Sequence, residues 1–273
     1  MSEQVVRAQG AEIPKLGFGT WQIHGEGCVE AVRDAIELGY RHVDTARAYD
    51  NERFVGRGLA ESGVGRGEVW ITTKVWMDDL SRDRLHASVE NSLLDLGTDY
   101  LDLVLIHWPS AQTPLEETFT ELVRLRDAGR VRHLGVSNFP AGMLSRALEL
   151  APILCDQVEY HPTLGQDRLL RLAEEHDLVV AAYAPFAHGE IHGDPVLTEI
   201  GEAHGKSAGQ VALRWLIDQE RVVAIPKAAS HENRVANLEI FDFELTGEER
   251  ERIDALPKDR RHFDTSWAPD WND

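Results

Sequence analysis

The octapeptide Asp44-Thr45-Ala46-Arg47-Ala48-Tyr49-Asp50-Asn51 places a carboxylate and a phenol at the end of an apolar run, residues 42–46. Two later apolar runs, each bounded by a helical pattern, end close to Lys74 and His107. In a barrel of parallel strands, active sites lie at the carboxyl ends of the strands. Four ionisable groups at corresponding places in successive repeats therefore predict one active site.

The acid–base chemistry of these four side chains is complementary. A free phenol has a pKa of about 10 and a free lysine about 10.4. An ammonium beside Tyr49 favours the phenolate, so it is expected to make the phenol a better acid near neutral pH. Asp44 would hold Lys74 charged and in place, and His107 would orient a carbonyl oxygen toward Tyr49. None of the four is a covalent nucleophile. Singly, each has an ordinary structural explanation; together they favour a catalytic site.

Eight apolar runs alternate with stretches of helical periodicity. Segments 26–38 and 82–96 place apolar residues on one face and stop at Gly39 and Gly97, as helices commonly do. Amphipathic helices between buried strands imply a parallel sheet, and eight such units close into an α/β fold, the (β/α)8 or TIM barrel. The predicted strands are residues 16–19, 42–46, 69–75, 100–107, 131–137, 154–159, 178–183 and 222–225.

The two ends of the chain carry additional pieces. Ala8-Gln9-Gly10-Ala11 reads as a turn between short strands, which predicts a β-hairpin that plugs the amino-terminal mouth of the barrel. Thr246 followed by Glu249 predicts a capped helix, and an irregular tail with Trp267 and Trp271 follows it. We expect one domain over residues 1–273, comprising the hairpin 4–15, the barrel 16–245, and the C-terminal helix and tail 246–273.

Composition narrows the class of partner. Aspartate and glutamate number 47 against 28 lysines and arginines, and the net charge of -19 disfavours nucleic acid and anionic membranes. This acidity has two readings, a solvated surface or a resemblance to cytoplasmic proteins of salt-accumulating organisms. The sequence has no run of ~18 apolar residues, and its start has no basic region followed by an apolar run. We expect a cytoplasmic protein without membrane contact.

Cysteines and histidines give weak signals. Cys28 and Cys155 cannot form a disulfide framework or a metal-binding pair, and both are expected to be buried. His188 and His192 flank Glu190 in a glycine-containing loop. The three could form a weak ion site or be solvated, and we expect the latter and no metal.

The run Gly39 to Ala46, followed by Tyr49, Asn51 and Glu52, is similar to the signature of the aldo-keto reductase family. Further matching blocks occur in order from residue 16 to about residue 246. They are Gly19-Thr20-Trp21, Thr73-Lys74-Val75-Trp76, Ile106-His107-Trp108-Pro109, Gly135-Val136-Ser137-Asn138-Phe139, Gln157, Tyr183-Ala184-Pro185, Ile225-Pro226-Lys227 and Phe241-Asp242-Phe243.

The resemblance implies a reductase that moves a hydride from a nicotinamide to a small aldehyde, ketone or keto sugar acid. Asp44, Tyr49, Lys74 and His107 would form the catalytic tetrad, with Tyr49 as the proton donor. The substrate would lie among Trp21, Tyr49, Trp76, His107 and Trp108. We expect a monomer whose partner is a small-molecule carbonyl compound.

The nicotinamide dinucleotide would lie across the carboxyl face of the barrel. A two-domain Rossmann enzyme is disfavoured because no G-x-G-x-x-G follows the first strand, and Gly63, Gly65 and Gly67 have the wrong spacing. Tyr183 could stack on the nicotinamide. The side chains expected to bind the cofactor are Thr20, Trp21, Asp44, Ser137, Asn138, Gln157, Tyr183, Pro185, Phe186, Lys227, Arg234 and Asn237. For Ser137 and Asn138, a simple turn before the next helix is the alternative.

The sequence departs from the family around the adenosine phosphate. Lys227 is retained, but the usual serine after it is Ala228, and the usual arginine is Asn233 with Arg234 one place later. The usual glutamate is Ala236. Lys227 and Arg234 are expected to bind a 2′-phosphate by charge-assisted hydrogen bonds. NADP(H) is therefore the preferred cofactor, and NAD(H) stays open.

Two rival functions use the same kind of barrel. One is a non-catalytic regulatory subunit, because the barrel also serves in potassium-channel β subunits. The other is a metal-dependent hydrolase. Retention of all four tetrad residues favours the reductase over both.

Overall fold

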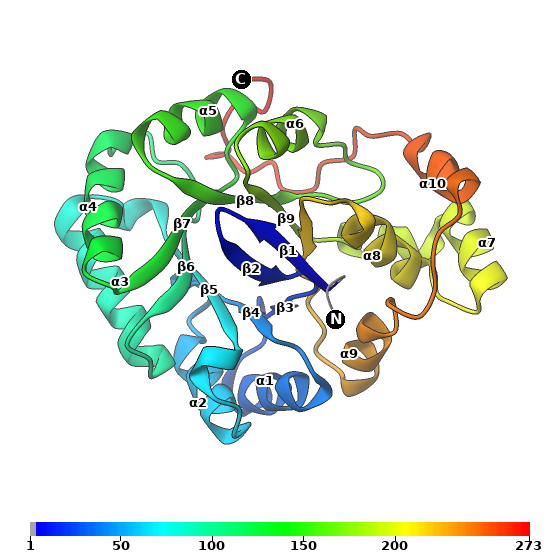
Figure 1. The fold of residues 1–273 in the computed structure, drawn as a ribbon, viewed down its shortest axis with the longest axis horizontal. Coiled ribbons are helices and arrows are strands. Elements are labelled where there is room, and N and C mark those ends of the chain that lie inside the picture. The colour runs from blue at the N-terminus through cyan, green and yellow to red at the C-terminus, as the bar shows by residue number, and fades with distance from the viewer. Residues whose placement is uncertain (1–3) are drawn as a thin grey trace.

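Eight parallel strands curve around a central axis in the computed structural model, which describes residues 4–273, and the helices lie outside them (Figure 1). Residues 1–3, which the expected domain includes, lie outside the described residues. Neighbouring strands follow the order β3 to β10 around the sheet. They are β3 (Phe18–Gly19), β4 (His42–Asp44), β5 (Trp70–Val75), β6 (Leu101–Ile106), β7 (Val131–Ser137), β8 (Ile153–Glu159), β9 (Val179–Tyr183) and β10 (Val222–Ala224).

The sheet closes between its first and last strands. Parallel bridges join Leu16 to Ala224 and Gly19 to Lys227, and the N–H of Gly17 donates to the carbonyl of Ala224 at 2.8 Å. The predicted strands agree with the observed ones to within one or two residues, except that β3 is only two residues long. The predicted (β/α)8 barrel is confirmed.

Helices follow the strands, with one addition to the expected alternation. Helix α1 (Gly25–Leu38) is capped by Gly39 and α3 (Arg82–Leu96) by Gly97, both with left-handed backbone (φ 114° and 65°), as the sequence predicts. Between β9 and β10 the chain forms η5 (Ala187–Gly193) and then two helices rather than one. The helices are α1 (Gly25–Leu38), α2 (Glu52–Glu61), α3 (Arg82–Leu96), α4 (Leu115–Asp127), α5 (Ala141–Leu150), α6 (Asp167–Glu175), α7 (Pro195–His204), α8 (Ala208–Asp218), α9 (His231–Leu238) and α10 (Gly247–Asp254).

The expected hairpin plugs one end of the barrel (Figure 1). Strands β1 (Val5–Ala8) and β2 (Ala11–Pro14) pair antiparallel, and Gln9 and Gly10 between them both have positive φ, as a two-residue hairpin turn requires. The inward side chains of the hairpin pack against apolar residues inside the barrel. The N–H of Gln9 donates to the carboxylate of Asp177, which precedes β9, so the plug closes the amino end. The hairpin therefore leaves the carboxyl end of the barrel uncovered.

The C-terminal segment crosses that carboxyl end. Thr246 and Glu249 form the predicted capping box at the start of α10. The chain after α10 is irregular and is fixed at intervals, for example by the N–H of Arg260 on the carbonyl of Thr163 at 3.0 Å. It finishes beside α5, where the N–H of Gly142 donates to the carbonyl of Asp273. The tail therefore contributes to the carboxyl face.

Two composition-based expectations can be compared with the fold. Cys28 and Cys155 are buried and unpaired, as expected. No helix among residues 4–273 is long and apolar enough to cross a membrane.

Candidate active site

Three of the four predicted tetrad residues meet in one hydrogen-bonded group at the carboxyl end of the barrel. The ammonium of Lys74 in β5 donates to Oδ1 of Asp44 in β4 at 2.6 Å and to the hydroxyl of Tyr49 at 3.3 Å. It also donates to the carbonyl of Thr45 at 2.8 Å. His107 completes the group, with its ring centroid 5.7 Å from that of Tyr49 and edge-on to it. The proximity predicted from the strand ends is thus observed.

The loop after β4 presents Tyr49 to this group. A short helix, η2 (Arg47–Tyr49), is followed by Asp50, which has left-handed backbone (φ 50°). The buried Asn51 anchors the turn, because its amide donates to the carbonyls of Thr20 and Ile23 at 2.9 and 3.0 Å. The hydroxyl of Thr45 donates to the Asn51 side-chain oxygen at 2.8 Å. The octapeptide therefore positions the phenol through its own polar side chains.

Electrostatics keep the lysine charged and the phenol protonated. Burial lowers the pKa of Lys74, but attraction to Asp44 and the bonds to Asp44 and Tyr49 outweigh it, so the pKa is raised. Burial raises the pKa of Tyr49, and Lys74 offsets this only in part, so the net direction is upward. The expected lowering of the phenol's pKa is therefore wrong for the protein alone, because desolvation of the hydroxyl is the larger effect. Tyr49 holds its proton at neutral pH.

His107 is buried and neutral. Burial and the nearby positive charge of Lys74 both hold the pKa of His107 well below its ordinary range. Its ring also lies edge-on to Trp76, with centroids 5.2 Å apart. A neutral imidazole can donate or accept a hydrogen bond without adding charge, which suits the orienting role assigned to it.

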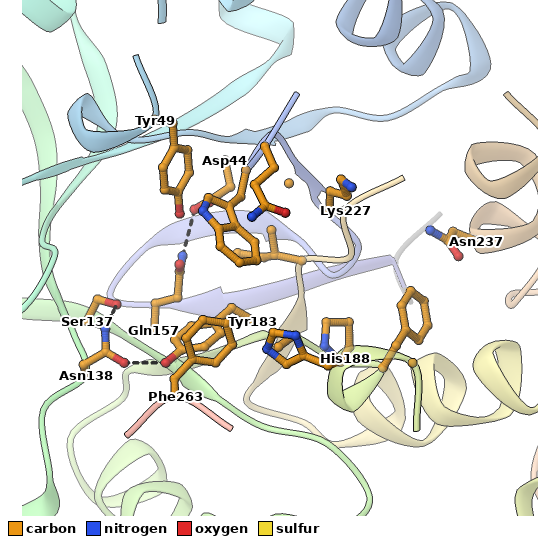
Figure 2. Close-up of a pocket in the computed structure, with 18 of the residues that line it drawn as sticks. Asp44, Tyr49, Ser137, Asn138, Gln157, Tyr183, His188, Lys227, Asn237 and Phe263 are labelled. Carbon is orange, nitrogen blue, oxygen red and sulfur yellow. Dashed lines mark hydrogen bonds between the residues drawn. The ribbon is translucent and has the colours of Figure 1, made fainter. Parts of the chain in front are cut away.

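A cavity of about 710 Å³ opens above the tetrad and extends toward α9 (Figure 2). At its inner end, Gln157 donates to Oδ2 of Asp44 at 2.8 Å, and the amide of Asn138 donates to the hydroxyl of Ser137 at 3.1 Å. The hydroxyl of Tyr183 donates to the Asn138 side-chain oxygen at 2.6 Å. These donors and acceptors come from the ends of neighbouring strands. They suit a planar carboxamide, and the ring of Tyr183 suits a stacked aromatic ring.

The backbone is strained where strands reach this cavity. Asn138 has φ 63° and Ala184, directly after β9, has φ 48°. His188 in η5 has φ 53°. Left-handed backbone costs a residue with a Cβ roughly 1 kcal/mol or more. Such conformations occur at binding sites, where they direct side chains that regular structure would not present.

The outer end of the cavity differs from the expectation. Lys227 is exposed and lines the wall together with Asn233, Ala236 and Asn237. Arg234, expected to bind a phosphate, does not line the cavity and is only 5% exposed. Its guanidinium donates to Asp34 of α1 at 2.6 Å. The helical turn that directs Asn233 toward the cavity directs its neighbour into the packing against α1, so Arg234 is removed from the candidate set.

Other predicted residues divide into two groups. Thr20 is fully buried, and both its N–H and its hydroxyl donate to the carbonyl of Asp44, so it supports the tetrad rather than lining the cavity. Trp21, Trp76, Trp108, Pro185 and Phe186 line the cavity as expected.

Sequence reasoning missed part of the cavity wall. The tail contributes Phe263, Thr265 and Trp267. Phe263 lies edge-on to Tyr183, with ring centroids 5.2 Å apart (Figure 2). The sequence singles out only the tryptophans of the tail. An irregular segment has no periodicity from which the positions of Phe263 and Thr265 can be inferred.

The structure brings together one further group that the sequence did not indicate. Glu159 at the end of β8, His161 and His262 of the tail have ligand atoms within 4.8 Å of one another. Both oxygens of Glu159 already accept hydrogen bonds from this chain. In the described part of the chain, His188, Glu190 and His192 do not form such a group, and Glu190 pairs instead with Arg260 at 2.9 Å.

A (β/α)8 barrel with a lysine, aspartate and tyrosine group below an elongated cavity defines the class, a barrel oxidoreductase. The profile of the aldo/keto reductase family matches residues 15–258, and this chain belongs to that family. It is 41% identical over 264 residues to a glyoxal reductase of Bacillus subtilis (strain 168), covering 96% of this chain and 95% of the relative. It is 36% identical over 266 residues to a methylglyoxal reductase of Escherichia coli O157:H7, covering 95% and 99%.

Solved structures agree. A protein provisionally named 2,5-diketo-D-gluconic acid reductase B superimposes with a TM-score of 0.95 at 43% identity, covering 98% of this chain and 97% of that one. The short connection after Trp76, the block from His107 to Ser110 and the tail with Trp267 and Trp271 predict a likeness to 2,5-diketo-D-gluconate reductase B, and this match confirms it. The aldose reductase of Schistosoma japonicum gives a TM-score of 0.91 at 30% identity, covering 97% and 98%. The protein is an oxidoreductase that acts on carbonyl groups.

Proposed function

We propose that this protein is an NADPH-dependent reductase of small carbonyl compounds in which Tyr49 protonates the carbonyl oxygen. The observation that carries the proposal is the position of the Lys74 ammonium, which bonds Asp44 at 2.6 Å and the Tyr49 hydroxyl at 3.3 Å. A charged lysine stabilises negative charge that develops on the phenol oxygen as the proton leaves. Asp44 keeps that lysine ionised.

The chain's residues fit the cofactor at the inner end of the cavity. Ser137, Asn138 and Gln157 offer hydroxyl and amide groups to a carboxamide, and Tyr183 offers a ring face. When bound there, reduced nicotinamide would supply the hydride for the carbonyl carbon. His107 would hold the carbonyl oxygen toward Tyr49, and the aromatic side chains of the wall would exclude water from the reacting atoms.

The cavity favours uncharged substrates over acids. Within the described cavity wall, Lys227 is the one lysine or arginine, and it lies at the outer end beside Asn233 and Asn237. The wall also carries Trp21, Trp76 and Trp108, and the protein has a net charge of -19. A small dicarbonyl such as glyoxal or methylglyoxal, the compounds for which two relatives are named, therefore fits better than a keto sugar acid.

A panel of carbonyl compounds tests this function. Oxidation of NADPH and of NADH would be followed at the nicotinamide absorbance with glyoxal, methylglyoxal, a simple aldehyde and a keto sugar acid. We expect turnover with the dicarbonyls and its loss in Tyr49→Phe. Absence of turnover with every carbonyl, together with tight binding of NADPH, would favour the non-catalytic alternative, which the named reductase relatives do not support.

A further inference from the structure

A buried carboxylate outside the tetrad joins the barrel to the tail. Glu159, the last residue of β8, has no exposed surface. Its Oε1 accepts the backbone N–H of His262 at 2.9 Å, and its Oε2 accepts the N–H groups of His262 and Phe263 at 3.1 and 3.0 Å. One carboxylate therefore holds two consecutive amides of a segment that has no regular structure of its own.

The carboxylate is ionised where it binds these amides. Burial pushes the pKa of Glu159 upward, but the hydrogen bond from His161 and those from the Phe263 and His262 amides outweigh burial, so the pKa is lowered. The His161 contact joins Nε2 to Oε1 at 3.1 Å. An ionised carboxylate can only accept hydrogen bonds, so Nε2 of His161 is the donor. The neighbouring hydroxyl of Thr163 lies 3.1 Å from Nδ1 and fixes the ring.

The segment held in this way forms part of the cavity wall. The ring of Phe263 lies 5.2 Å from that of Tyr183, 5.8 Å from that of Trp21 and 4.9 Å from that of His188. Trp21 follows β3, Tyr183 ends β9 and His188 follows β9, so Phe263 lies among side chains from both sides of the seam where β3 meets β10. Trp267, four residues later, lies 6.3 Å from Trp76. The position of Phe263 therefore sets the shape of this part of the cavity wall.

We propose that Glu159 is a positioning residue that fixes Phe263 over the cavity and thereby shapes the substrate-binding part of the site. The proposal rests on the proposed reductase function. Its physical basis is geometric: two adjacent amides bound to one carboxylate fix both the position and the direction of the chain at Phe263. If Glu159 had a purely structural role, replacing it would lower the global stability of the protein, and the tail would not open more readily than the rest of the fold.

Limited proteolysis distinguishes these two roles without any turnover. Trypsin can cut after Lys258, Arg260 and Arg261, immediately before the clamped residues. In Glu159→Gln, which keeps the shape and removes the charge, we expect cleavage there to be about tenfold faster, since hydrogen bonds to charged groups contribute about that factor or more. The matched control is Asp102→Asn, another buried carboxylate that accepts a backbone N–H, from Ile71, and lies outside the cavity wall. Both variants are digested at the same interval below their own melting temperatures. Equal tail cleavage in Glu159→Gln and wild type would overturn the proposal.

Kinetics test the link to the site. We expect Glu159→Gln to raise KM for a small dicarbonyl several-fold, with a smaller effect on kcat, and Asp102→Asn to change neither. In a Phe263→Ala background, Glu159→Gln should raise KM little further, because both substitutions disturb the same part of the cavity wall. Fully additive effects on KM would show that Glu159 does not act through Phe263. Wild-type turnover is measured first: its absence would count against the proposed function, while the trypsin result would still decide whether Glu159 holds the tail.

Discussion

The guanidinium of Arg234 donates to Oδ2 of Asp34 in α1 at 2.6 Å, so its charge is paired where the two helices pack together and does not face the cavity. The same guanidinium donates to the carbonyls of Ala228 and Ala229 at 3.0 and 2.8 Å. Lys227 is the cation that remains in the described cavity wall. A 2′-phosphate at the outer end would then meet one positive side chain, which should make the preference for NADPH over NADH modest.

Lys227→Ala should weaken NADPH binding about tenfold or more and leave NADH nearly unchanged. A hydrogen bond to a charged group contributes about 1.5 to 3 kcal/mol, and each 1.4 kcal/mol is a factor of ten in Kd. NADH has no 2′-phosphate to lose. Titration of the intrinsic tryptophan fluorescence with each cofactor measures the two constants.

The control for this prediction is Arg234→Ala. Because that side chain is buried and paired, we expect a lower melting temperature and an NADPH to NADH affinity ratio within about twofold of the wild type. Equal losses of both cofactors in Lys227→Ala would assign Lys227 a structural role instead.

Tyr49→Phe should reduce kcat by about 10²- to 10⁴-fold, the usual contribution of a positioned general acid. The ring stays in contact with His107 and only the hydroxyl at Lys74 is removed, so the Kd for NADPH should hold. Tyr160→Phe is the matched control, since that buried hydroxyl bonds Gln219 and lies outside the cavity wall. A Tyr49→Phe enzyme with more than about a tenth of wild-type kcat would contradict the assignment.

Asp156 should make the protein less stable as pH rises from 4 to 7. It lies fully buried in β8, and burial raises the pKa of its carboxyl well above its usual range. A group whose pKa is raised by folding contributes its full stability below the unfolded pKa of about 3.9, and that stability is lost as pH rises toward the folded value.

Asp156→Asn cannot ionise, so its free energy of unfolding should fall less over the same pH range. Each pH unit over which the two states differ by one proton corresponds to ~1.4 kcal/mol, and we expect at least about that difference between the two proteins by pH 7. Urea unfolding at several pH values measures it. Asp102→Asn serves as the comparison, because that carboxylate is paired with Arg66 and Arg132. Parallel curves for Asp156→Asn and wild type would show that Asp156 does not titrate as described.

Salt should stabilise the fold. With 47 acidic and 28 basic residues, like charges repel over the surface, and raising ionic strength from 0.1 to 1 M shortens the Debye length from ~10 to ~3 Å. The melting temperature should rise in potassium chloride and in tetramethylammonium chloride alike, because screening depends on ionic strength. A melting temperature that is flat in both salts would remove the salt-adaptation hypothesis.

Local signals in the sequence were enough for the fold and the centre of the site. Gly39 and Gly97 marked helix ends, Thr246 with Glu249 marked a helix start, and apolar runs located the strands whose ends carry Asp44 and Lys74. Parallel strands place such ends on one face, so proximity within the tetrad could be derived from order alone.

Contacts between distant segments could not be derived in this way. Arg234 lies 200 residues from Asp34, and Glu159 lies 104 residues from Phe263, with no shared periodicity to relate them. The pKa of Tyr49 depends on how deeply its hydroxyl is buried, which spacing does not reveal. The sequence thus located the four candidate catalytic residues, whereas the residues of the cavity wall could be placed only from the three-dimensional structure.

The residues with left-handed backbone on the carboxyl face imply that the two ends of the barrel differ in local stability against thermal unfolding. Among residues 4–273, the non-glycine residues with positive φ follow strand ends on that face, apart from Gln9 and Asp177 at the plugged end. Each carries a conformational cost that surrounding contacts must offset, and regions of low local stability open first. Warming should therefore unfold the loops at the carboxyl end of the barrel before the amino end that the hairpin closes. A preparation stored close to its melting temperature would keep its shape for longer than its activity.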